Sequence, residues 1–218
     1  PLFHTDAIQA APFLNLDVEE LGVDLMSLSA HKFNGPKGIG VLYMKNGTPF
    51  ESQMTGGGQE RQKRSGTENI AFISGAATAM KLAHNEKPTL SKNLNEYRNL
   101  IIDFIKQNFP DTIINGHTEN CLPNIINLTF QNIRADDLIS ALDLEDICIS
   151  NGSACTTNSL EPSHVLKSIG VNANLAINTV RISLGRYNTK EEITEFLKIL
   201  KMILNRSSKL KYETSVEI

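Results

Sequence analysis

The chain has 218 residues, 40% of them hydrophobic and 21% charged, which is enough for a buried core and typical of a globular protein. Its formal net charge of −3 gives no reason to expect a nucleic acid or an anionic membrane as a partner. No apolar stretch approaches the ~20 residues that a membrane span needs, so we expect a cytoplasmic protein.

The first part of the chain alternates strand and helix patterns. Short apolar runs predict strands and the stretches between them predict helical turns, which together favour an α/β fold with a largely buried sheet. The Gly-rich segment 55–61 can form only a loop, and a long helix rich in Ala and Gly is expected after it. The expected elements are a strand at 2–5, a helix at 17–21, strands at 23–29 and 39–44, and a helix at 67–84.

A break at Lys87-Pro88 marks the predicted domain boundary, which gives domains of residues 1–88 and 89–218. Beyond it, apolar residues three and four positions apart predict an amphipathic helix. The last helix is expected to be capped by Asn188-Thr189. The expected elements are helices at 90–109, 135–142 and 190–204 and strands at 124–130, 146–150 and 179–184.

The cysteines and histidines give no metal or disulfide pattern. Cys121, Cys148 and Cys155 form no C-x-x-C pair, which argues against a disulfide framework and a four-sulfur zinc site. The five histidines show no H-x-x-x-H spacing, so we expect no metal site. Cys148 lies between two isoleucines and is expected in the core, whereas Cys121 is expected in a loop without a role.

Lys32 lies where a buried strand is expected to end and a Gly/Pro-rich loop begins. A lysine in that position can hold an aldehyde cofactor as a Schiff base, and Ser29 and His31 can bind a phosphate within its reach. The glycines of the loop let a flat ligand approach the backbone. Lys37 is a competing candidate, but Lys32 is preferred because it directly ends the strand. A surface lysine at a strand end is the alternative interpretation.

Asp6 also follows a strand, so it should lie with Lys32 at the carboxyl edge of a parallel sheet, where α/β proteins bind ligands. An aspartate there can pair with a protonated pyridine nitrogen and make the ring a better electron sink. Gln9, three residues later, can donate to a phenolic oxygen on the same ring. The alternative for Asp6 is the N-cap of a helix.

Cys155 lies in a run of small polar residues, 150–157, where an exposed thiol can attack a bound substrate. With an ordinary thiol pKa of ~8.5, it needs an activating proton acceptor, which the sequence does not reveal. Arg181 interrupts a predicted strand and can bind a substrate carboxylate as a bidentate donor. An arginine that extends to solvent is the alternative, and spacing alone favours it.

Five runs, distributed over nearly the whole chain, resemble the cysteine desulfurases. These are enzymes of the class V aminotransferase superfamily that use pyridoxal 5′-phosphate (PLP) and have fold type I; the likeness is to the branch with a long active-cysteine loop. The runs are HTDAIQ (4–9), SLSAHKFNGPKGIG (27–40), GGGQERQKRSGTEN (56–69), SNGSACTTNSLEPSHVL (150–166) and VRISLGRYNTKEEI (180–193).

The resemblance covers almost all of this chain but only about the C-terminal half of a family member. It implies that residues 1–88 are the C-terminal part of the large PLP-binding domain, which keeps the remainder of its sheet. Residues 89–218 would be the small α+β domain that carries the active-cysteine loop.

The resemblance also implies roles for the residues around the cofactor. Lys32 would hold PLP as a Schiff base, Asp6 would pair with its pyridine nitrogen and Gln9 with its ring oxygen. Ser29 and His31 would bind the PLP phosphate.

Three further residues receive roles from the resemblance. Thr67 would reach the phosphate in the other subunit of a homodimer. Arg181 would hold the carboxylate of L-cysteine, and Cys155 would take the substrate sulfur as a persulfide while L-alanine is released.

The sulfur acceptor would be an iron–sulfur scaffold protein or a tRNA-thiolation enzyme. A selenocysteine lyase is a second possibility, and the long cysteine loop argues against an aminotransferase-like relative. A non-catalytic fragment that keeps dimerisation or scaffold-binding surfaces is a third.

Overall fold

The computed structural model describes residues 1–151 and 163–216. The chain divides into two compact units, Pro1–Leu90 and Ser91–Ile218, which are described one after the other. Among the described helices, none is long and apolar enough to cross a membrane.

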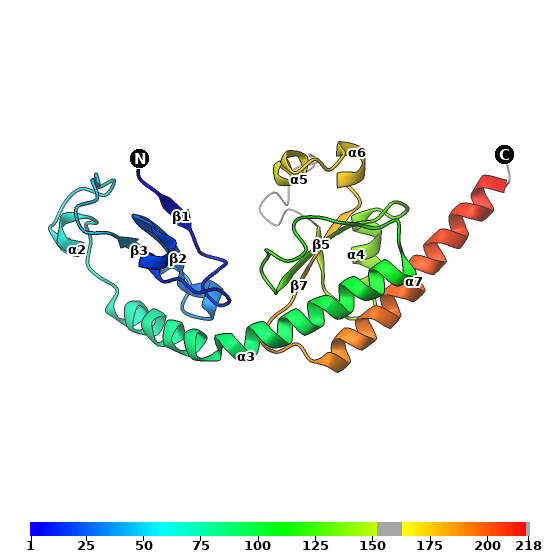
Figure 1. Cartoon of the computed structure of the whole chain (residues 1–218), viewed down its shortest axis with the longest axis horizontal. Coiled ribbons are helices and arrows are strands. Elements are labelled where there is room, and N and C mark those ends of the chain that lie inside the picture. The colour runs from blue at the N-terminus through cyan, green and yellow to red at the C-terminus, as the bar shows by residue number, and fades with distance from the viewer. Residues whose placement is uncertain (152–162, 217–218) are drawn as a thin grey trace. The chain divides into compact units, whose positions relative to one another are not determined.

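The first unit is built on a three-stranded sheet with the order β1-β2-β3 (Figure 1). Its strands are β1 (His4–Asp6), β2 (Leu25–Ser29) and β3 (Gly40–Met44). Strand β1 pairs with β2 in parallel, and β3 pairs with β2 in antiparallel. The helical elements are α1 (Val18–Leu21), η1 (Ala30–Phe33), α2 (Gln59–Gln62) and the first part of α3 (Ile70–Asn108).

Two small clusters form the core of the first unit. Ala30 and Phe33 of η1 pack with Ala11 and with Ala76 of α3, while a second cluster surrounds Met26 of β2. The sheet is less buried than its apolar sequence predicts, because Val41 and Leu42 of β3 are 44% and 45% exposed. Small residues dominate this core, so its elements approach one another closely.

Gly35 shows how close that approach is. A Cβ atom at this position would lie 3.0 Å from the Cβ of Ala30 and 3.2 Å from the Cβ of Ala79 in α3. Contacts this short force a neighbour to move, so only glycine fits without displacement. The loop after Lys32 therefore packs directly on α3. This packing explains the glycine at position 35 without any ligand.

The helices expected at 67–84 and 90–109 are one continuous helix, α3, so Lys87-Pro88 does not interrupt the helical pattern. The helix continues from Ile70 to Asn108 with Pro88 inside it. A proline within a helix removes one backbone hydrogen bond and costs ~3 kcal/mol, and the packing of residues on both sides of it outweighs that cost here. Lys87 contributes a tertiary contact, since its Nζ donates a hydrogen bond to the carbonyl of Leu14 at 2.6 Å.

The second unit contains a four-stranded antiparallel sheet with the order β4-β5-β7-β6, of which β5 and β7 are labelled in Figure 1. Its strands are β4 (Ile113–Ile114), β5 (Ile125–Thr129), β6 (Ser150–Asn151) and β7 (Thr179–Ser183). Its helices are the second part of α3, α4 (Ala135–Asp143), α5 (His164–Ser168), α6 (Ala173–Ala176) and α7 (Lys190–Val216). The fully buried core residues include Leu94, Ile101, Ile105, Ile126, Leu128, Leu138, Leu142 and Leu200.

The predicted cap of the last helix is confirmed. The backbone N–H of Glu192 donates to Thr189 Oγ1 at 3.2 Å, and the N–H of Thr189 donates to Glu192 Oε2 at 3.0 Å. This reciprocal pair satisfies two backbone donors that a helix N-terminus leaves open.

Cys148 is not in the core, contrary to the sequence-based expectation. Its side chain is exposed, and the strand expected at 146–150 is reduced to Ser150–Asn151. Asp146 has a left-handed backbone with φ 59°, which turns the chain before a strand can begin. Ile147 and Ile149 are half-buried, so alternation along the backbone places the cysteine between them on the open side.

Candidate functional site

The carboxyl edge of the β1–β2 pair collects the residues predicted to bind a cofactor. The two strands are parallel, with Asp6 opposite Ser27 in the register, so both strands end at the same edge. Asp6 is the last residue of β1, and its Oδ1 accepts a hydrogen bond from the backbone N–H of Ile8 at 3.0 Å. That bond holds the carboxylate at the edge of the sheet.

Lys32 lies in η1 and does not end the strand directly as its sequence position suggests. Strand β2 ends at Ser29, and one 3₁₀ turn follows it. Ala30 and Phe33 of this turn are buried while His31 and Lys32 are exposed. The turn is thus anchored on its apolar side and presents the two polar side chains to solvent.

Ser29 and His31 form a hydrogen-bonded pair. Ser29 Oγ lies 2.8 Å from His31 Nδ1, so the two predicted phosphate-binding side chains are brought together next to Lys32. A second contact of the same kind links β1 to β2, where His4 Nε2 is 2.9 Å from Ser27 Oγ. The sequence interpretation missed this contact, although serines two positions apart on one strand share a face.

The remaining cofactor candidates lie in loops. Gln9 is exposed in the turn that follows β1, and Thr67 is exposed just before α3 begins. Lys37, the competing lysine, is also exposed, beyond η1.

The Gly-rich loop before Thr67 has a strained backbone. Glu60 and Arg61 have φ of 49° and 55°, the left-handed region that costs a residue with a side chain ~1–2 kcal/mol. The loop is tied down at its ends, because Gln59 Oε1 accepts a hydrogen bond from the N–H of Gly66 at 3.1 Å. Such strain is concentrated at ligand-binding and switch segments.

Arg181 and Cys155 belong to the second unit. Arg181 lies in the middle of β7, paired with Asn127 of β5 and Ser150 of β6. Its side chain is half-buried, and its Nε is buried without a hydrogen-bond partner among the described residues. The role of Arg181 in binding a substrate carboxylate stays a prediction. Cys155 lies outside the described residues.

Comparisons with known proteins cover most of the chain. A model of the aminotransferase class-V family matches residues 1–196. The cysteine desulfurase IscS of Dictyoglomus turgidum is 44% identical over 204 residues, which are 94% of this chain and 52% of that protein. The cysteine desulfurase IscS of Clostridium botulinum is 43% identical over 206 residues, with the same two shares.

A solved structure described as a NifS-like protein has the same architecture. It superimposes with a TM-score of 0.82 at 38% sequence identity, and the match covers 94% of this chain and 52% of that one. The chain thus spans about half the length of the curated relatives it matches. The predicted α/β architecture of PLP fold type I is confirmed by these matches, and the chain belongs to the aminotransferase class-V family.

Proposed function

We propose that this protein is a PLP-dependent cysteine desulfurase. It would remove sulfur from L-cysteine, release L-alanine and hold the sulfur as a persulfide on Cys155. The observation that carries the proposal is the Ser29–His31 pair, 2.8 Å apart, next to Lys32 at the sheet edge that also bears Asp6. The names of two relatives that match the chain, cysteine desulfurases of two bacteria, support it.

The Ser29–His31 pair fits a phosphate in either arrangement of its protons. If Ser29 donates to His31 Nδ1, the imidazole keeps an Nε2–H donor; if His31 donates, the serine hydroxyl hydrogen is free. At least one donor therefore remains for a phosphate oxygen. A phosphate accepts several such bonds, so the pair suits the PLP phosphate.

Asp6 and Lys32 fit the pyridine nitrogen and the aldehyde of the cofactor. Asp6 Oδ1 is occupied by the N–H of Ile8, which orients the carboxylate and leaves Oδ2 to accept from a protonated pyridine nitrogen. Lys32 is exposed on an anchored turn, so its amine can reach an aldehyde. Gln9 follows Asp6 in the same turn and would donate to the ring oxygen.

PLP supplies an aldehyde that captures amines and a ring that accepts an electron pair from the substrate. Lys32 Nζ would first bind the cofactor and, once the substrate amine has replaced it, carry the proton to and from the substrate Cα. The guanidinium of Arg181 would orient L-cysteine through its carboxylate. The thiolate of Cys155 would then attack the substrate sulfur, forming the S–S bond as the C–S bond breaks.

The wider setting of the reaction is also a proposal. We place the protein in the cytoplasm as a homodimer, with Thr67 binding the phosphate in the other subunit. Its sulfur would pass to an iron–sulfur scaffold protein or to a tRNA-thiolation enzyme. Residues 1–88 would belong to the large PLP-binding domain and residues 89–218 to the small domain.

The two exposed lysines give a matched test of the cofactor site. We expect the purified chain to show a visible absorbance band after addition of PLP and removal of excess. Lys37→Ala should keep the band, and Lys32→Ala should lose it. Loss of the band in Lys37→Ala alone would identify Lys37 as the reactive amine. A band that survives in both variants would exclude both lysines as the reactive amine.

A further inference from the structure

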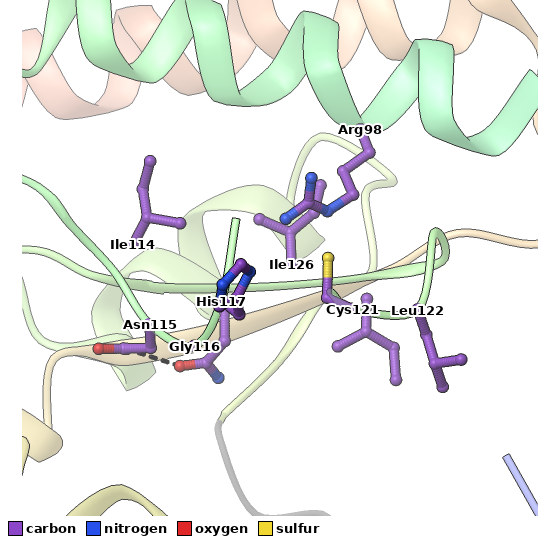
Figure 2. Close-up of a pocket in the computed structure, with 10 residues that line it drawn as sticks. Arg98, Ile114, Asn115, Gly116, His117, Cys121, Leu122 and Ile126 are labelled. Carbon is purple, nitrogen blue, oxygen red and sulfur yellow. Dashed lines mark hydrogen bonds between the residues drawn. The ribbon is translucent and has the colours of Figure 1, made fainter. Parts of the chain in front are cut away.

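The second unit holds a cavity of ≈ 220 Å³ that the proposed reaction does not use. It lies between the second part of α3, strand β4, the loop after it and strand β5 (Figure 2). Its lining residues include an arginine, a histidine and a cysteine beside several aliphatic side chains, and among the described residues no Asp or Glu lines it. The cavity is therefore positively charged and partly apolar.

Arg98 supplies the positive charge. It occupies the apolar stripe of α3 between Leu94 and Ile101 and is only 6% exposed. Its Nη1 donates to the carbonyl of Thr118 at 3.1 Å, but its Nε has no hydrogen-bond partner among the described residues. Figure 2 shows the guanidinium extending from the helix toward Ile126 and Cys121. A buried cation with an unpaired N–H is costly unless an anion or another acceptor approaches it.

His117 provides a second donor on the cavity wall. Its Nδ1 accepts hydrogen bonds from the backbone N–H groups of Glu119 at 3.0 Å and Asn120 at 2.9 Å. A ring nitrogen that accepts twice carries no proton, so the proton of the neutral ring is on Nε2. Asn115 is not a comparable donor, because its Nδ2 already donates to Asn127 and Thr129 at 2.7 Å each.

The rest of the wall is aliphatic. Ile114, Leu122 and Ile125 line the cavity and give it no further charge. We propose that this cavity binds a small aliphatic carboxylate, whose oxygens contact the guanidinium of Arg98 and Nε2–H of His117 while its hydrocarbon body packs on these side chains. A carboxylate matches the fork of donors on an arginine, and the cavity volume matches a molecule of a few carbon atoms.

Cys121 allows the proposal to be tested without a mutation. Its exposed thiol lines the same cavity, whereas the exposed thiol of Cys148 does not, so Cys148 is an internal control. The probe is 3-methylbutanoate, with 3-methylbutanamide as its neutral isostere. The readout is the rate at which iodoacetamide alkylates each cysteine of the purified chain, followed by peptide mass spectrometry.

We expect the carboxylate to slow alkylation of Cys121 saturably, at least about threefold, and to leave Cys148 unchanged. The amide should need an about tenfold higher concentration for the same protection, because the hydrogen bonds of Arg98 to a charged carboxylate are stronger than those to a neutral amide. Equal protection by the two compounds, or no protection of Cys121 by the carboxylate, would overturn the proposal.

Two pairs of variants locate the anion contact. His117→Ala should weaken protection several-fold, and the exposed His84→Ala should not. Arg98→Lys keeps the charge but loses the planar set of guanidinium donors, so it should also weaken the protection of Cys121. Arg134→Lys, the same change at an exposed position, should not. If Arg98→Lys melts below the assay temperature, His117→Ala decides; unchanged protection there would contradict the proposed binding mode.

Discussion

The two units of the chain bury their side chains very differently. Met26 is the only residue of the first unit among the largest fully buried side chains that the structure describes; all the others lie in the second unit. Both units leave some large apolar residues exposed, but the first does so with almost no fully buried ones beside them; its exposed residues include Ile70 at 75%, Leu2 at 55% and Phe3 at 53%. The second unit thus has a core of its own, and the first presents surfaces that suit a covering partner.

The proposed functional residues are also divided between the two units. The residues that we assign to the cofactor lie in the first unit, and Arg181 and Cys155, which we assign to the substrate and its sulfur, lie in the second. In the homodimer that we propose, Thr67 would bind the phosphate of a second cofactor. This comparison predicts that cofactor binding and sulfur transfer can be separated by mutation.

Cys155→Ala should have the largest effect. We expect it to abolish sulfide release from L-cysteine in the presence of reductant, by several orders of magnitude, while the visible absorbance of bound PLP stays intact. Cys148→Ala, which removes an exposed thiol of the same unit, should leave sulfide release unchanged. Unimpaired release from Cys155→Ala would remove this residue from the mechanism.

The difference in burial can be tested with two leucines of the second unit. Leu138 of α4 is fully buried and Leu144, just after that helix, is 87% exposed. Leu138→Ala should lower the free energy of unfolding by about 2–5 kcal/mol, because it removes buried methyl groups and leaves a cavity. Leu144→Ala should change it by less than about 0.5 kcal/mol.

Urea denaturation followed by circular dichroism measures both leucine variants. Similar losses for Leu138→Ala and Leu144→Ala would show that the core of the second unit does not hold it together as described.

Several features of the fold and site were accessible from the sequence. Apolar runs bounded by Gly, Pro and polar residues located β2, β3, β5 and β7 to within two residues, and the Thr189–Glu192 cap followed from its residue types. The placement of Asp6 and Lys32 near one sheet edge also followed from strand order. These features depend on local patterns, which a sequence displays directly.

Other features depend on contacts that no local pattern shows. Pro88 looks like a helix end, but tertiary packing carries α3 through it. The signal for the cavity of the second unit was present and overlooked, because Arg98 falls on the stripe of Leu94 and Ile101, where an apolar residue is expected. Side-chain pairs such as His4 with Ser27 needed the register of the strands.

Gly35 tests the close packing of the first unit. Gly35→Ala should lower the free energy of unfolding by about 1–3 kcal/mol, because its Cβ would lie 3.0 Å from both the Cβ and the carbonyl oxygen of Ala30. Gly58→Ala is the matched control, since an added Cβ there meets only Gln62 Cγ at 3.9 Å and the backbone φ is −85°.

Displacement of the loop at Gly35→Ala should also weaken PLP binding, because the same loop follows Lys32. An alanine at Gly35 that changes neither stability nor PLP absorbance would show that the loop can move away from α3 without consequence.

The smallest effect is expected at Lys87, a partly buried lysine of α3 whose Nζ donates to the carbonyl of Leu14. Partial burial lowers the pKa of this lysine below its usual value of 10.5. The unfolded chain therefore binds more protons at alkaline pH, so this residue makes the free energy of unfolding rise as the pH increases toward 10.5. Because most of the group remains hydrated, the change should stay below about 0.5 kcal/mol.

Lys87→Met removes this titration, so the chain and the variant should differ in the slope of the free energy of unfolding with pH above neutrality. The exposed Lys81→Met, on the same helix, controls for loss of one charge and should keep the slope of the unmodified chain. The other titrating groups are present in all three proteins and cancel in the comparison. Identical slopes in all three would show that folding does not lower the pKa of Lys87, and a steeper slope in Lys87→Met would show that folding raises it.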